Sequence, residues 1–82
     1  MSQQEPMQAS FSMLIMSIAS SAAMAMGLSP EGQAVEKDKN MARFNIDLLL
    51  VLKDKTKSNL STEEQHFLDS VISDLQRKFL QI

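Results

Sequence analysis

The sequence predicts a small all-α protein of three helices, with an antiparallel hairpin of the second and third helices packed on an apolar N-terminal helix. In two segments, 40–57 and 62–80, apolar residues recur at spacings of three and four, as they do along one side of an amphipathic helix. No segment alternates polar and apolar residues for long enough to indicate a strand. The chain has 82 residues and no cysteine, so we expect one domain without disulfides, formed by residues 9–82.

The first helix is predicted for residues 9–27. Residues 1–8 before it are polar, and we expect them to form a disordered tail. Methionine and alanine dominate the segment that follows, and both residue types favour helices. Gly27 is the expected end of this helix, because glycine adopts the positive φ of a helix C-terminus without strain.

The second helix is predicted for residues 40–57, with Asp38 or Asn40 as its N-cap. Its apolar side is broad. This side comprises Met41, Ala42, Asn45, Leu48, Leu49, Leu52 and Thr56. Because Leu50 and Val51 fall outside it, we expect this helix to contact more than one neighbour.

The third helix, predicted for residues 62–80, has the clearest start. Ser61 and Glu64 have the spacing of a capping box, in which each side chain accepts a hydrogen bond from the backbone amide of the other residue. An apolar stripe follows. It comprises Phe67, Leu68, Val71, Ile72, Leu75, Phe79 and Ile82. The short turn at residues 57–60 predicts the hairpin with the second helix.

Several short motifs from Phe11 onward occur in a characteristic order. They include Ala42-Arg43, Ile46-Asp47-Leu48-Leu49, Lys55-Thr56, Asn59-Leu60, Glu63-Glu64 and Asp74-Leu75, and the most specific segment is ARFNIDLLLVLKDKTKSNLSTEE. In this order the chain resembles the short bacterial proteins grouped as domain-of-unknown-function family 1844, over most of its length. That family usually has glycine where this chain has Ser58. The resemblance implies a small helical bacterial protein, and it implies no catalytic residue, cofactor or partner.

Residues 11–28 contain no charged side chain, so a membrane helix, a signal peptide and a buried helix all have to be weighed. Serines dilute the hydrophobicity of the segment, and no Lys or Arg precedes Lys37 to set an orientation in a membrane. A signal peptide starts with positive charge, whereas residues 1–10 of this chain carry one charged side chain, Glu5, and no basic one. We therefore expect a buried helix in a cytoplasmic protein.

Little in the sequence indicates an active site, and we expect no enzymatic activity, cofactor or metal. Glu63, His66 and Asp69 have the spacing of di-iron helices, but they share the polar side of one helix without a second ligand set. There is no Gly-x-Ser-x-Gly elbow and no glycine-rich phosphate loop. The net charge is −2, and the lysines alternate with acidic residues, which argues against a nucleic-acid surface. Arg43 and Asp47, one helical turn apart, are expected to pair.

The first helix carries the functional prediction, because neither of its sides is charged. One side is expected to pack on the hairpin, and it comprises Phe11, Leu14, Ile15, Ile18, Ala22 and Ala25. The other side comprises Met13, Met16, Ser17, Ser20, Ala23 and Met24. In a monomeric bundle the outer side of each helix is normally charged. We therefore predict that these six residues bind a second copy of the chain or a larger partner.

The predicted function is that of a non-enzymatic protein-interaction module, either an intertwined or a side-by-side homodimer. Two alternatives remain open. In the first, residues 11–28 form an inserted or interfacial helix of a membrane-associated protein. In the second, the methionines line a pocket that carries an apolar ligand.

Overall fold

A computed structural model of the protein describes residues 9–28 and 37–82. In this part of the chain there are three helices and no strand. The helices are α1 (Phe11–Ala25), α2 (Lys39–Lys55) and α3 (Thr62–Phe79). The prediction of a three-helix fold without strands is confirmed, and each helix begins and ends within two residues of the predicted bounds. The tail expected at residues 1–8 lies outside the described residues.

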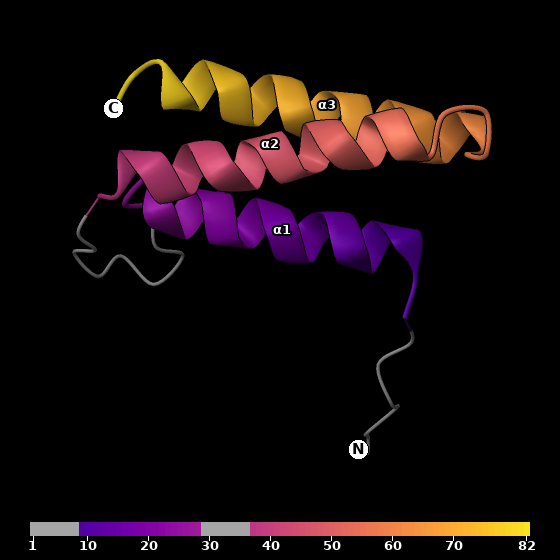
Figure 1. The fold of residues 1–82 in the computed structure, drawn as a ribbon, viewed down its shortest axis with the longest axis horizontal. Coiled ribbons are helices and arrows are strands. Elements are labelled where there is room, and N and C mark those ends of the chain that lie inside the picture. Colours follow the sequence, from indigo (N-terminus) through magenta and orange to yellow (C-terminus); the bar gives the residue numbers. More distant parts are fainter. Residues whose placement is uncertain (1–8, 29–36) are drawn as a thin grey trace.

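The three helices lie side by side, with α2 between α1 and α3 in the view of Figure 1. The chain turns back after Lys55, and α3 then runs along α2 (Figure 1). α1 and α3 also contact each other, so every helix packs on the other two. The backbone amide of Asp38 donates to the carbonyl oxygen of Ala25 at 2.7 Å, which joins the end of α1 to the start of α2.

Side chains cap the N-termini of α1 and α2. The hydroxyl of Ser10 accepts from the amide of Met13, and the carboxylate of Asp38 accepts from the amide of Met41, each at 3.1 Å. Each bond satisfies an amide that a helix start leaves without a backbone partner. Of the two caps considered for α2, Asp38 is therefore correct and Asn40 is not.

The capping box of α3 is confirmed. The Ser61 hydroxyl accepts from the Glu64 amide at 3.1 Å, and a Glu64 carboxylate oxygen accepts from the Ser61 amide at 2.9 Å. Because the two residues are three positions apart, this structure forms locally and fixes where α3 begins.

Two residues of the described chain have positive φ. Gly27 has φ 85°, as predicted, and the amides of Gly27 and Leu28 donate to the carbonyls of Met24 and Ala23 in a Schellman arrangement. Ser58, in the turn after α2, has φ 72°. Here a residue with a Cβ takes a backbone conformation that suits glycine.

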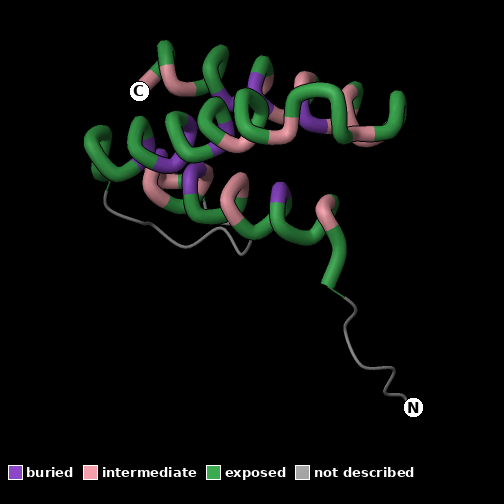
Figure 2. Tube along the Cα trace, turned by 45° about the vertical axis from the view of Figure 1, so that its right-hand side comes forward, coloured by how far each residue is buried: buried purple, intermediate pink, exposed green. Residues whose placement is uncertain are grey.

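The core lies where the three helices face one another, as the buried segments in Figure 2 show. Its residues come from all three helices and from the end of α1. They are Ile15, Ala22, Met26, Ala42, Ile46, Leu49, Leu68, Ile72 and Leu75. These side chains are aliphatic or sulphur-containing, so the helices meet through a close-packed apolar contact, and Asn45 is the polar residue buried beside it.

The buried sides of α1 and α2 differ from those predicted. Leu14 was expected to face the hairpin, yet it is 46 % exposed. On α2, Met41 and Leu48 are 49 % and 36 % exposed, whereas Ile46, which was left out of the predicted side, is buried. The reason is that α2 packs on two neighbours, so its core side lies between the two contacts, centred on Ala42 and Ile46.

Candidate functional site

The six residues predicted for self-association lie mainly on the outer side of α1. Met13, Met16, Ser17, Ser20 and Met24 are exposed, and Ala23 is half-buried. The three methionines are 44 %, 47 % and 44 % exposed. Long apolar side chains are thus in water along much of this helix.

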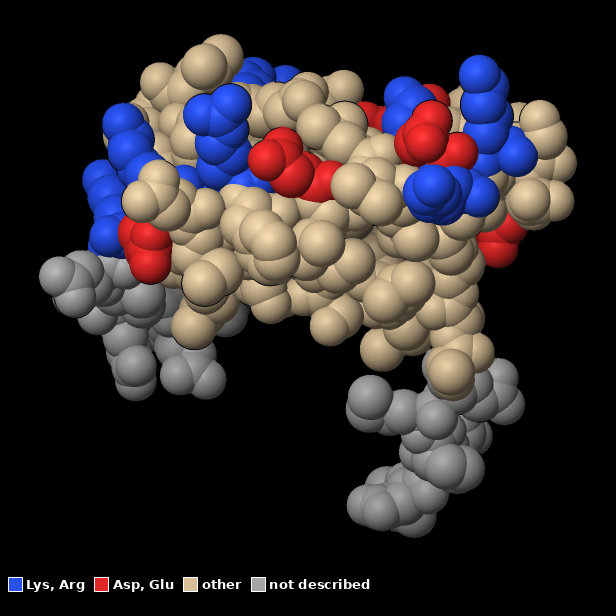
Figure 3. Space-filling model, viewed as in Figure 1, with Lys and Arg blue, Asp and Glu red and all other residues tan. Residues whose placement is uncertain are grey.

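No charged residue accompanies these methionines. The sequence has no Asp, Glu, Lys or Arg from Phe11 to Leu28. Figure 3 shows the result on one face of the molecule, where charged atoms gather over α2 and α3 and the surface over α1 is uncharged. Exposed apolar residues gathered on one surface are a feature of interaction sites.

The sequence analysis missed a second apolar stripe, on α2. Its members recur at spacings of three, four and three, and they are Met41, Phe44, Leu48 and Val51. They are 49 %, 55 %, 36 % and 53 % exposed. The spacing is that of a coiled-coil seam and was legible in the sequence. The stripe was missed because Met41 and Leu48 were assigned to the core side of this helix, so Phe44 was not recognised as part of a second apolar side.

A shallow hollow connects this stripe with α1. Its lining comes from the end of α1 and the start of α2, and it comprises Ser20, Ser21, Met24, Ala25, Asp38, Met41 and Asn45. The structure thus brings two of the predicted residues, Ser20 and Met24, next to α2. At 100° per residue, Met16 and Ala23 lie on the side of α1 turned away from this hollow.

We name the combined surface the α1/α2 face. Its members are Met13, Leu14, Ser17, Ser20, Ser21 and Met24 of α1, with Met41, Phe44, Leu48 and Val51 of α2. None of these ten side chains is ionisable.

Asn45 lies at the edge of the α1/α2 face and is only 7 % exposed. Its side-chain nitrogen Nδ2 donates to the carbonyl oxygen of Met41 at 3.0 Å, so the amide forms the expected hydrogen bond to its own helix. Within the described chain its oxygen Oδ1 accepts no hydrogen bond. Leaving such an oxygen unpaired in a covered site costs about 1–3 kcal/mol. A molecule that covers the hollow avoids this cost if it places a hydrogen-bond donor beside Oδ1 of Asn45.

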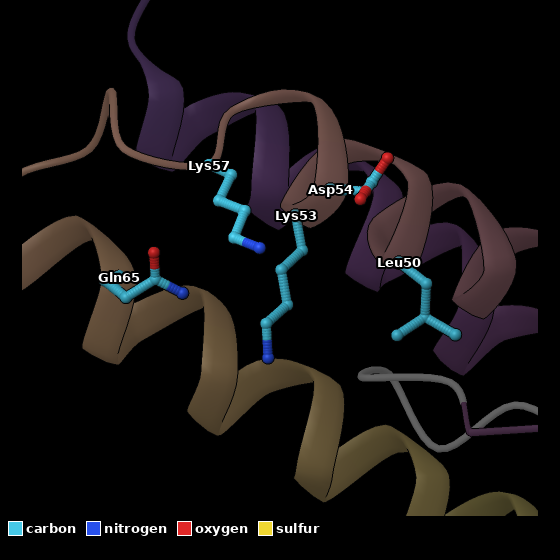
Figure 4. A pocket seen from close by; sticks show the side chains of 5 residues that line it. All are labelled: Leu50, Lys53, Asp54, Lys57 and Gln65. Carbon is cyan, nitrogen blue, oxygen red and sulfur yellow. The ribbon is translucent and has the colours of Figure 1, made fainter.

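A different hollow lies between α2 and α3, and charge dominates it. Figure 4 shows Lys53 reaching from α2 toward α3, with Lys57 and Gln65 beside it and Leu50 and Asp54 further along. Lys53 is already occupied, because its Nζ lies 2.9 Å from Oδ1 of a carboxylate on α3, that of Asp69.

Hydrogen bonds lower the pKa of two carboxyl groups on α3. The pKa of Asp69 is lowered mainly by its hydrogen bond with Lys53, and that of Asp74 mainly by its hydrogen bond with Lys78. Lys78 Nζ lies 3.0 Å from Asp74, and Arg77 contacts the same carboxylate at 2.6 Å. These pairs are at the surface, so they stabilise the fold only weakly and indicate no reaction chemistry.

The residues with metal-like spacing do not converge on a site. Asp69 is engaged by Lys53 and, at 3.2 Å, by Gln65, while His66 is exposed. Among residues 9–28 and 37–82, no group of acidic and histidine side chains is placed to hold a metal ion.

The predicted ion pair between Arg43 and Asp47 is wrong, since no salt bridge joins these two residues of α2. Both side chains instead line a further hollow between α2 and α3, together with Phe79 and Leu80. An acidic residue four positions before a basic one is the more favourable order in a helix, and here the order is reversed.

No helix in the described segments combines the length and the apolar character needed to cross a bilayer.

Comparison with known proteins gives one match. The family described as domain of unknown function (DUF1844) matches residues 8–81. No curated protein and no solved structure matches the chain.

Proposed function

This chain belongs to the family described as domain of unknown function (DUF1844), and from that premise we propose that it is a non-enzymatic interaction module that self-associates through α1. The family supplies no activity, so the proposal rests on one observation. The outer side of α1 exposes methionines at 44–47 % in a segment without a single charged residue.

The outer sides of the other helices support the proposal by contrast. α3 carries acidic residues in its first turn, basic residues in its last turn and ion pairs at Asp74. α1 has no acidic residue in its first turn and no basic residue in its last. A helix that is apolar all round is normally buried all round. The missing cover of α1 then comes from another molecule.

The length of the chain also favours association. A domain of this size buries only about 60 % of its unfolded surface as a monomer, which leaves little free energy of folding. An association that binds only the folded chain adds to that free energy by mass action.

A homodimer is the simplest assembly, because a twofold contact needs only one self-complementary surface. In this proposal α2 and α3 form an antiparallel hairpin that holds α1 with its methionine side outward. The dimer works in the cytoplasm, where the surface left outside the dimer contact is free to bind a further protein.

The test is the mass of the tag-free protein in solution without detergent. Sedimentation equilibrium should give twice the 9.2 kDa of the chain. Ser20→Arg, which puts a charge on the outer side of α1, should convert the dimer to monomer. Ser73→Arg makes the same change at an exposed position of α3 and should leave the dimer intact. A monomeric wild-type protein, or a Ser20→Arg variant that stays dimeric, would contradict the proposal.

The exposed methionines also suit a membrane-associated helix or a carrier of an apolar ligand. Flotation of the protein with liposomes would favour the first. An added small mass in native mass spectrometry would favour the second, although the hollow beside Met24 is shallow for a carrier.

A further inference from the structure

We infer that the self-association proposed above uses α2 as much as α1, with α2 of one copy packed on α1 of the second copy across the α1/α2 face. The inference rests on the proposed function, since it specifies the partner helix for the same surface. Two such contacts, related by the twofold axis, build a second apolar core between the copies.

The first argument is that the exposed apolar surface is continuous over both helices. The stripe of α2 exposes side chains as large as Phe44, at 55 %, and Val51, at 53 %. The shallow hollow that includes Met24 and Met41 joins this stripe to α1. A contact confined to α1 and its symmetry mate would leave Phe44 and Val51 in water. A contact over both helices covers them.

The second argument is shape. The central members of the α1/α2 face are small on α1, where Ser17 and Ser20 stand, and large on α2, where Phe44 and Leu48 stand. Large side chains on one helix fit against small ones on another and let the two backbones approach. Pairing α2 with α2 would oppose large residues, whereas pairing α1 with α1 would leave the large residues unused. Packing α2 on the middle of α1 matches large with small at Ser17 and Ser20, with the exposed Met13 and Met24 toward the two ends of α1, and twofold symmetry provides that match twice.

The third argument is Asn45, whose Oδ1 has no hydrogen-bond donor within the described chain although the residue is only 7 % exposed. Covering the hollow requires a donor for this oxygen, because an unpaired buried acceptor is costly. The stripe of α2 has no donor in its side chains. Of the two helices that a second copy could place here, α1 brings the hydroxyls of Ser17 and Ser20 and the stripe of α2 brings none, so α1 adds to the donors that Ser20 and Ser21 of the same chain already hold at this hollow.

The charges of α2 are compatible with this arrangement. Arg43, Asp47 and Asp54 line the hollows between α2 and α3, on the other side of the helix from the α1/α2 face. A second copy seated on the α1/α2 face therefore buries none of these three. The charged residue that lines the hollow of the α1/α2 face itself is Asp38, whose carboxylate keeps its hydrogen bond from the Met41 amide.

Disulfide trapping tests the arrangement, and the chain suits it because it has no native cysteine. The probes are single-cysteine variants of α1 (Ser17→Cys, Ser20→Cys) and of α2 (Phe44→Cys, Leu48→Cys). A disulfide requires the two Cβ atoms to come within about 4.5 Å, so it reports direct contact. We expect a linked dimer when an α1 variant is mixed with an α2 variant and oxidised, and none when either is oxidised alone. In the control experiment the α1 variant is mixed with Ser73→Cys, on α3, in place of the α2 variant, and no linked dimer should form.

The outcomes separate this inference from the proposed function. If the wild-type protein is dimeric and Ser20→Cys links only to itself, α1 packs on α1, so the proposed function stands and the inference is wrong. If Leu48→Cys links only to itself, α2 packs on α2 and the inference is also wrong. A dimer in which no combination links would place the contact off this face and would overturn the inference. A monomeric wild-type protein would overturn both.

Discussion

α1 and α3 flank the same helix, but they are stabilised in opposite ways. α3 has a complete capping box, acidic residues at its start, basic residues at its end and two ion pairs to Asp74. α1 has one serine cap, a Schellman end and no charge. α3 therefore contains the features of a helix that remains folded beside water. α1 gains most of its stability from contact with other helices, and in the proposed function its exposed side is where the second copy binds.

The largest expected effect concerns the inner side of α3. Leu68 is fully buried, whereas Leu80, just beyond the end of the same helix, is 83 % exposed. Leu68→Ala should lower the free energy of unfolding by about 2–5 kcal/mol, because it removes apolar contacts and leaves a cavity. Leu80→Ala should change it little. Urea denaturation at one fixed protein concentration measures both, and equal effects of the two variants would mean that the core is wrongly placed.

The next effect separates the two exposed sides of α2. Leu48 and Leu50 are the same residue type on the same helix and are similarly exposed, at 36 % and 39 %. Leu48 belongs to the α1/α2 face, whereas Leu50 lines the charged hollow toward α3. Leu48→Ala should raise the dissociation constant of the dimer about tenfold, which corresponds to about 1.4 kcal/mol.

Leu50→Ala serves as the matched control and should leave dimer dissociation unchanged. Sedimentation across a dilution series measures both constants. If Leu50→Ala weakens the dimer and Leu48→Ala does not, the contact lies between α2 and α3 rather than on the α1/α2 face.

The sequence predicted helix ends better than helix sides, and the reason is physical. A cap such as Ser61 with Glu64 depends on two residues three positions apart, so it can be recognised without knowing the fold. Which side of α2 is buried depends on how many neighbours it has. For that reason Ile46 was overlooked as a core residue, and Phe44 was overlooked at the surface. The uncharged side of α1 was recognised because absence of charge is a property of the sequence itself.

A smaller effect compares the two turns that end α1 and α2. The first uses Gly27 at φ 85° and the second uses Ser58 at φ 72°. Since a Cβ makes this region unfavourable, Ser58→Gly should raise the free energy of unfolding by about 0.5 kcal/mol, after allowance for the greater freedom of glycine in the unfolded chain. Gly27→Ala should lower it by about 1 kcal/mol. Thermal unfolding measures both, and a destabilised Ser58→Gly variant would show that the serine side chain, rather than its backbone, matters in this turn.

The smallest expected effect is acid sensitivity confined to α3. Hydrogen bonds with Lys53 and Lys78 lower the pKa of Asp69 and Asp74 below the ordinary value of 3.8. A carboxyl group with a lowered pKa in the folded state favours folding when it is ionised. Its contribution is complete above the ordinary pKa and is lost as the pH falls through the folded value. The free energy of unfolding should therefore fall as the pH drops below about 4, and the fall should be smaller in Asp74→Asn.

Because these carboxylates are exposed, added salt should weaken the same contribution. Ser20→Arg, which alters only α1, should shift the whole curve of stability against pH without changing its slope in the acid range. Urea unfolding at a series of pH values distinguishes the two variants. The opposite result would be an Asp74→Asn variant with an unchanged slope of stability against pH in the acid range and a Ser20→Arg variant with a changed one. In that case α3 is not stabilised by its own charges in the way that distinguishes it from α1.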